Sequence, residues 1–176
     1  MASAPTNAPR EPALELYAAI RSAGARGRRH RQLAGEIARY LGAVSILLVG
    51  AVHAQQYYDA YFSVVPTIGT LFLLSFIGAG IVGTILFAPV RRLGRELGDA
   101  VLIVAALGAI CIAVGTFVSL LISEYTPLFG FMESGYRLAV VLTLVFDVMT
   151  TVFLGVFVAL IAPQLIRTIA TNRRLR

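Results

Sequence analysis

Four long stretches without acidic or basic residues most constrain how this chain can fold. They are residues 40–58, 64–90, 100–123 and 138–166, and only Asp147 interrupts the last of them. A helix needs about 20 apolar residues to cross the hydrocarbon core of a bilayer. Because each backbone amide in hydrocarbon needs a partner within its own segment, the four stretches are expected to be helices. The chain is therefore predicted to be an all-α membrane protein with four spans.

Composition excludes the common alternatives to a membrane protein. Of the 176 residues, 58% are hydrophobic and 14% are charged, whereas soluble domains carry about 25% charged residues and disordered chains have low hydrophobicity. One cysteine, Cys111, excludes an internal disulfide framework and a multi-thiolate zinc site. Two histidines, His30 and His53, leave little room for haem or metal ligation, so neither a metal nor a cofactor is predicted.

The arginines indicate how the spans are oriented. All 15 basic residues are arginine, and 14 of them lie before residue 40, in the segment 91–99, or after residue 166. Arg137 alone lies on the other side. Since cytoplasmic segments carry the excess of basic residues, both termini are predicted to be cytoplasmic. With short connections between the spans, this predicts an up-down-up-down four-helix bundle over residues 40–168 in the cytoplasmic membrane of a bacterium.

The two basic tails are expected to lie on the cytoplasmic side. Residues 169–176 form the shorter one, and residues 1–39 form an arginine-rich tail with two short amphipathic helical pieces, separated near Gly24 and Gly27. The arginine cluster of the longer tail is predicted to contact anionic lipid. Nucleic-acid binding is a less favoured interpretation of that cluster. A signal peptide cleaved after Ala54 is another alternative, but the preceding polar region is too long for one.

Small residues recur at four-residue spacing in every span, which allows helices to approach closely in lipid. They are Gly50 and Ala54; Ser75, Ala79 and Gly83; Cys111, Gly115 and Ser119; and Thr151, Gly155 and Ala159. Packing within the bundle is the favoured interpretation. A homo-oligomer or another membrane protein as partner is the alternative.

Three prolines are expected to shape the helices. Pro66 should begin the second helix and Pro89 should help to end it. Pro163 is expected to kink the fourth helix near its end.

Asp147 is the most informative polar residue, because it lies ten residues from Arg137. At 1.5 Å per residue this is roughly 15 Å into a hydrocarbon core about 30 Å thick. A charged carboxylate at that depth is costly, so Asp147 should face the bundle and be paired or protonated. The same depth on the other helices predicts one polar layer: Asp147, His53, Ser75 and Cys111, with Gln56, Thr143 and Thr151 close to it. The layer is interpreted as a hydrogen-bonded core that fixes helix register, or as a proton- or ligand-binding site.

Tyrosines gather where the first span ends. Tyr57, Tyr58 and Tyr61 are typical of an aromatic belt at the membrane interface. The alternative is that they line an outward-facing cleft for a quinone or a small amphiphile.

The segment that contains His53, Gln55, Gln56 and Tyr57, followed by Val-Pro-Thr-Ile-Gly at residues 65–69, resembles a group of small four-helix membrane proteins of actinobacteria. The similar stretch covers about 25 residues, from Ala51 to Leu74. The resemblance implies a topology, not an activity.

Three functional hypotheses follow from these residues. The first is a non-enzymatic accessory or scaffold component that acts through helix–helix contacts. The second is a small oligomeric transporter or proton-coupled carrier that uses Asp147 as its titrating group. The third and least favoured is a quinone- or haem-linked membrane oxidoreductase that uses the region of His53.

Overall fold

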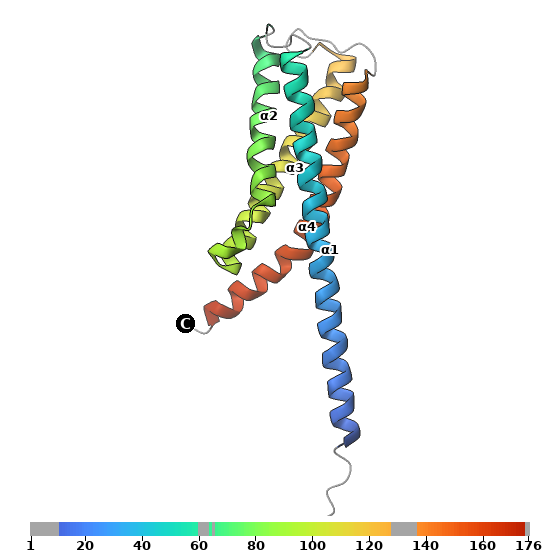
Figure 1. Ribbon diagram of the computed structural model, residues 1–176, viewed down its shortest axis with the longest axis vertical. Coiled ribbons are helices and arrows are strands. Elements are labelled where there is room, and N and C mark those ends of the chain that lie inside the picture. The colour runs from blue at the N-terminus through green and yellow to red at the C-terminus, as the bar shows by residue number, and fades with distance from the viewer. Residues whose placement is uncertain (1–10, 60–63, 65, 128–136, 175–176) are drawn as a thin grey trace, which may run out of the picture.

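The described part of the chain contains four α-helices and the short 3₁₀ helix η2 (Figure 1). The computed structural model describes residues 11–59, 64, 66–127 and 137–174. The elements are α1 (Glu11–Tyr58), α2 (Pro66–Phe87), η2 (Val90–Leu93), α3 (Arg95–Tyr125) and α4 (Leu138–Arg174). All four α-helices contain a segment long and apolar enough to cross a membrane. The predicted all-helical fold with four candidate spans is confirmed, and it indicates a multi-pass membrane protein.

The outer surface of the bundle is apolar. Leu74, Ile81, Val104 and Val152 come from three different helices, and each of these side chains is more than half exposed. Soluble monomers rarely expose apolar patches of this kind. In a bilayer the same side chains contact acyl chains, so they need no cover from protein.

The helices pack as a ring in which α1 contacts both α2 and α4 extensively, and α3 packs on α4. α2 and α3 contact each other least among the neighbouring pairs. On α3, Ala105, Ala106 and Ala109 are almost fully buried and bring its N-terminal half close to the rest of the core. Since small side chains permit close approach of helix backbones, the bundle is tightest in the half nearest η2. We call this half the η2 end and the opposite half the Tyr58 end.

Glycines mark the closest helix contacts. A Cβ atom built on Gly50 would lie 3.0 Å from Cβ of Ala79, and one on Gly83 would lie 2.6 Å from Cδ2 of Leu47. The predicted packing function of the small residues is therefore confirmed for α1 against α2. No described atom lies within 4 Å of a Cβ built on Gly115 or Gly155, so these two positions make no close helix contact among the described residues.

Two of the expected helix boundaries are confirmed. α2 begins at Pro66 and ends at Phe87, and Pro89 precedes η2. Pro163 lies inside α4, and Figure 1 shows the C-terminal part of that helix bending away from the bundle. A proline inside a helix removes a backbone hydrogen bond and favours such a bend.

The N-terminal tail differs from the expectation of two short pieces. α1 continues without a break from Glu11 through Gly24 and Gly27 to Tyr58, and it projects far beyond the bundle (Figure 1). The prediction of a break at the glycines is wrong. A single glycine costs a helix only about 1 kcal/mol relative to alanine, and the alanines and arginines around both positions favour helix strongly enough to continue through them.

Candidate functional site

A cavity of about 420 Å³ opens at the Tyr58 end of the bundle. Most of its walls come from α2 and α3, and α1 and α4 supply the remainder. Its lining includes His53, Gln56, Ile68, Leu71, Phe72, Leu74, Ser75, Cys111, Ile112, Gly115, Thr116, Ser119, Leu120, Ser123, Ala139, Val140 and Thr143. Pockets that hold small molecules usually measure about 300–1,000 Å³, so this cavity is large enough for one.

Small side chains on α3 explain why the cavity exists. Cys111, Gly115 and Ser119 follow one another at four-residue spacing and therefore share one face of the helix. All three line the cavity. The stripe that was expected to pack against another helix instead lines open space, and a Cβ built on Gly115 meets no atom of another described element within 4 Å.

His53 supplies an imidazole ring to the wall of the cavity. Its Nδ1 lies 2.8 Å from the backbone oxygen of Val49, and its ring centroid lies 5.2 Å from that of Phe72. A carbonyl oxygen only accepts, so Nδ1 carries the proton in this contact. In the neutral ring Nε2 is then the acceptor, and it is the nitrogen left for another partner.

Several hydroxyl groups in the lining donate to the backbone of their own helix. Thr143 Oγ1 donates to the Ala139 oxygen at 2.9 Å, and Ser123 Oγ donates to the Leu120 oxygen at 2.8 Å. A hydroxyl that donates one hydrogen bond can still accept others through its oxygen lone pairs. These groups therefore favour a bound molecule that donates hydrogen bonds.

Asp147 lies behind this wall, 1% exposed. Its Oδ2 is 2.8 Å from Oγ1 of Thr116, and Thr116 itself lines the cavity. The backbone oxygen of Asp147 accepts a hydrogen bond from Thr151 Oγ1 at 2.9 Å. Thr116 thus links the carboxyl group to the cavity through a hydrogen bond.

The predicted polar layer divides into two groups. His53, Gln56, Ser75, Cys111 and Thr143 line the cavity together. Asp147 and Thr151 do not line it. Asp147 is linked to the cavity by its hydrogen bond with Thr116, and Thr151 donates to the backbone oxygen of Asp147.

The tyrosines of the predicted outward-facing cleft are not part of this cavity in the described part of the chain. The rings of Tyr57 and Tyr58 meet edge to face with centroids 5.0 Å apart. Within the described part of the chain, neither ring lines the cavity. Tyr61 lies outside the described residues.

Sequence reasoning missed Thr116, the hydrogen-bond partner of Asp147. The depth argument selected Cys111 on α3, five residues away in sequence. The signal that could have found Thr116 is its type, because among residues 100–123 it is the one threonine.

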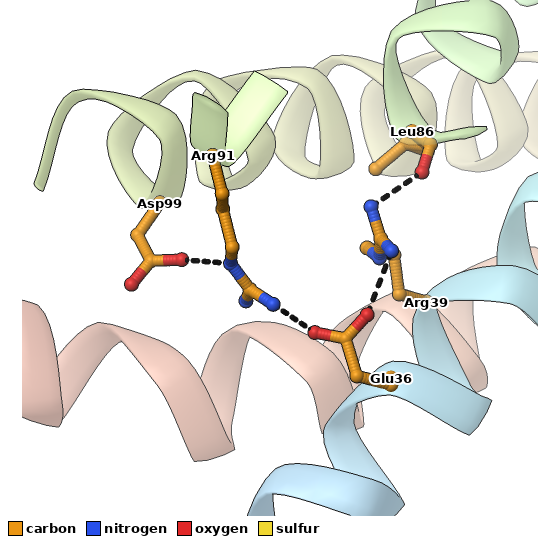
Figure 2. A network of polar contacts seen from close by, with 5 residues as sticks. All are labelled: Glu36, Arg39, Leu86, Arg91 and Asp99. Atoms are coloured by element: carbon orange, nitrogen blue, oxygen red, sulfur yellow. Dashed lines mark hydrogen bonds and ion pairs between the residues drawn. The ribbon is translucent and has the colours of Figure 1, made fainter. Parts of the chain in front are cut away.

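The opposite, η2 end of the bundle carries an ionic cluster, defined here as Glu36, Arg39, Arg91 and Asp99 (Figure 2). Arg91 donates from Nε to Asp99 Oδ1 at 2.6 Å and also bonds to the Glu36 carboxylate. Arg39 donates to the other Glu36 oxygen at 2.7 Å and to the Leu86 backbone oxygen at 2.9 Å. The cluster therefore joins α1, the end of α2, η2 and the start of α3.

The neighbours of Arg91 shift the pKa of its guanidinium. Partial burial lowers the pKa of its guanidinium, but hydrogen bonds and charge from Asp99 and Glu36 outweigh this, so the pKa lies above its ordinary value. A second cavity, of about 430 Å³, lies beside the cluster and is lined by Gln32, Glu36, Arg91, Arg95, Asp99, Ile161 and Gln164. In the lining of this cavity, Arg91 forms ion pairs with Glu36 and Asp99. Paired charges of this kind are typical of a structural contact between helices.

No group of three metal-ligating side chains occurs among the residues that the structure describes. In comparisons with known proteins, no family model, no curated protein and no solved structure matches the chain. The functional argument therefore rests on the geometry of the cavity and of the residues around it.

Proposed function

We propose that this chain binds a small amphipathic molecule within the membrane, in the cavity at the Tyr58 end. The main support for this proposal is the cavity of about 420 Å³, which is lined by residues of all four helices. Ile68, Leu71 and Phe72 provide an apolar wall for the body of the ligand. His53 and Thr143 provide acceptors for a polar end with hydroxyl or amide donors. A mostly apolar wall with a few placed polar groups is the usual design of such sites.

The proposal includes an orientation in the membrane. Arginine is concentrated in α1 before residue 40, around η2 and at the end of α4, and basic residues accumulate on the cytoplasmic side. We place both termini and the ionic cluster there, in an up-down-up-down bundle of a bacterial cytoplasmic membrane. The cavity then lies in the outer half of the bilayer. Binding of this kind is the first requirement of the carrier hypothesis.

The experiment compares two glycine variants of the full chain, purified in mild detergent and analysed by native mass spectrometry. Gly115→Leu fills the cavity, whereas Gly155→Leu adds the same side chain on α4 outside it. At both glycines a built Cβ meets no atom of another described element within 4 Å, so neither substitution places its Cβ in a close helix contact. The wild type and Gly155→Leu should retain the same small amphiphile, and Gly115→Leu should lose it.

Labelling of Cys111 gives a second readout. Cys111 is the one cysteine of the chain and its side chain lines the cavity. Stripping the bound molecule with harsh detergent should speed the reaction of Cys111 with a maleimide. If the wild type and Gly115→Leu hold the same molecules and label at the same rate, the binding proposal is wrong.

A second candidate is the accessory or scaffold component. It is favoured by the open position at Gly155 on α4, where Val152 and Val156 are also exposed. Small residues on an exposed face let a partner helix approach closely. The same variants separate the two functions, because Gly155→Leu should weaken a helix–helix partnership and leave ligand retention unchanged.

A further inference from the structure

The carboxyl group of Asp147 has an unusual environment for a charged group. It is 1% exposed, and its Oδ1 has no hydrogen-bond partner among the described residues. No ion pair in the described part of the chain includes Asp147. An ionised carboxylate in hydrocarbon is costly unless it is paired.

The titratable groups on the neighbouring helices do not provide a positive partner. His53 of α1 and Cys111 of α3 line the cavity, and neither forms a hydrogen bond or an ion pair with Asp147 in the described part of the chain. The charged residues Glu36 and Arg39 of α1 belong to the ionic cluster at the η2 end. α2 has no titratable residue between Pro66 and Phe87, and α4 has no second one between Leu138 and Ile166.

The hydrogen-bond partners of Thr116 restrict the protonation state of Asp147. Its Oγ1 lies 3.0 Å from the Ile112 backbone oxygen, 3.0 Å from the Ala113 backbone oxygen and 2.8 Å from Asp147 Oδ2. A threonine hydroxyl has one proton to donate and two lone pairs to accept with. Both backbone oxygens can only accept. If Asp147 is ionised, all three oxygens compete for the same proton.

A protonated Asp147 resolves this competition. The acid O–H donates from Oδ2 to Thr116 Oγ1, and the Thr116 proton goes to a backbone oxygen in the preceding turn. Oδ1 is then a neutral carbonyl oxygen, and leaving it without a partner costs far less than leaving a charged oxygen. This arrangement uses every donor and buries no net charge.

We propose that Asp147 is a proton-binding site inside the membrane, held as a carboxylic acid that donates to Thr116. Thr116 also lines the cavity, so a molecule that bonds to its hydroxyl alters the free energy of holding the proton. Linkage is reciprocal, and protonation of Asp147 alters the affinity of the cavity by the same factor. The linkage rests on the proposed ligand site, whereas the proton site does not.

Infrared spectroscopy of the full chain in lipid nanodiscs tests the proton site. At neutral pH the wild type should show the carbonyl band of a protonated carboxylic acid, which moves when water is replaced by heavy water. Asp147→Asn should lack this band. In Thr116→Val the band should persist at a different frequency, and Thr116→Ser should restore its position because the hydroxyl is kept.

Isotope labelling supplies a version of the test without any substitution. The chain has three aspartates, Asp59, Asp99 and Asp147. Asp59 is exposed and Asp99 forms an ion pair with Arg91, so Asp147 is the one aspartate that is both buried and without a basic partner in the described part of the chain. Aspartate labelled with ¹³C at the side-chain carboxyl should therefore shift the acid band through Asp147 alone. Absence of the band, or a band that ignores both the label and Asp147→Asn, overturns the proton site.

Alkylation of Cys111 with N-ethylmaleimide tests the linkage separately, because it places a small group in the cavity. The acid band should move on alkylation of the wild type and stay in place on alkylation of Thr116→Val. A band that ignores alkylation overturns the linkage. A cavity that retains no ligand overturns the proposed function and leaves the infrared result on Asp147 standing, so the two failures are distinguishable.

Discussion

The Cα atom of Arg91 lies 2.6 Å from the point where a Cβ atom on Gly98 would stand. The backbone nitrogen of Arg91 and the backbone oxygen of Val90 are each 2.9 Å from the same point. Since these neighbours are backbone atoms, they cannot move aside by changing a rotamer. Glycine at position 98 is therefore what allows η2 to lie against the first turn of α3.

Gly98→Ala is expected to destabilise the protein by about 1–3 kcal/mol, the usual cost of overpacking. Thermal unfolding in detergent measures the effect. Gly27→Ala is the matched control, because no described atom lies within 4 Å of its built Cβ. Alanine there should leave stability unchanged or raise it by about 0.5–1 kcal/mol. Equal melting temperatures for the two variants would contradict the close contact.

Replacement of Arg39 is expected to weaken the η2 end of the bundle. Arg39 is 5% exposed and bonds to both Glu36 and the Leu86 backbone oxygen. Arg39→Met keeps the apolar stem and should cost about 1.5–3 kcal/mol, the range for hydrogen bonds to charged groups. Denaturant titration provides the measurement. Arg92→Met, at an exposed position of η2, is the control and should change stability by less than about 0.5 kcal/mol.

Gly42 and Leu154 are expected to be energetically coupled. A Cβ built on Gly42 would lie 2.4 Å from Cδ2 of Leu154, a fully buried side chain. Gly42→Ala should therefore cost about 1–3 kcal/mol alone and clearly less in a Leu154→Ala background. A double-mutant cycle measures the difference. Additive effects of the two substitutions would refute the contact.

The contribution of Arg91 is expected to be insensitive to alkaline pH. A group whose pKa is raised on folding contributes its stability below the unfolded pKa and loses it as pH rises through the folded pKa. The pKa of Arg91 is raised by Asp99 and Glu36 after the opposing effect of burial. The loss therefore falls in strongly alkaline solution. The stability difference between the wild type and Arg91→Met should stay constant from neutral to mildly alkaline pH, and a steady decline would contradict this.

The orientation is tested by a reporter fused after Arg176. A reporter active only in the cytoplasm should be active there, and moving Arg92 and Arg95 to the segment around Asp59 should disturb the insertion, because basic residues set the orientation. An inactive reporter in the unaltered chain, with an active periplasmic one, would reverse the proposed orientation and place the cavity in the inner half of the bilayer.

The four candidate spans could be predicted from sequence because the signal is one-dimensional. A run of apolar residues bounded by charges, with Pro66 and Pro89 near the ends of α2, needs no knowledge of neighbours. The continuity of α1 could not be predicted in the same way. Gly24 and Gly27 weaken a helix without ending it, and the balance depends on the residues on both sides.

The candidate site shows where sequence reasoning ends. Depth along a helix follows from counting residues, which is how His53, Ser75 and Cys111 were selected. The rotation of each helix about its axis does not follow from counting, and it decides that Thr116 and not Cys111 meets Asp147. The ionic cluster was missed for a related reason: Glu36 and Arg91 are 55 residues apart, and arginines at membrane boundaries were interpreted only as orientation signals.

The unbroken course of α1 has a mechanical consequence. At about 1.5 Å per residue a helix of this length exceeds 70 Å, more than twice the thickness of the hydrocarbon core. The same rod carries the projecting arginine-rich segment, then the Glu36 contact with Arg91, then His53 in the wall of the cavity. Beyond Glu36 the bundle holds this rod, because Ala43, Ile46 and Val49 are fully buried in the core. A lipid or protein that binds the projecting arginine-rich segment therefore binds a direct helical continuation of the element that supplies His53 to the cavity wall.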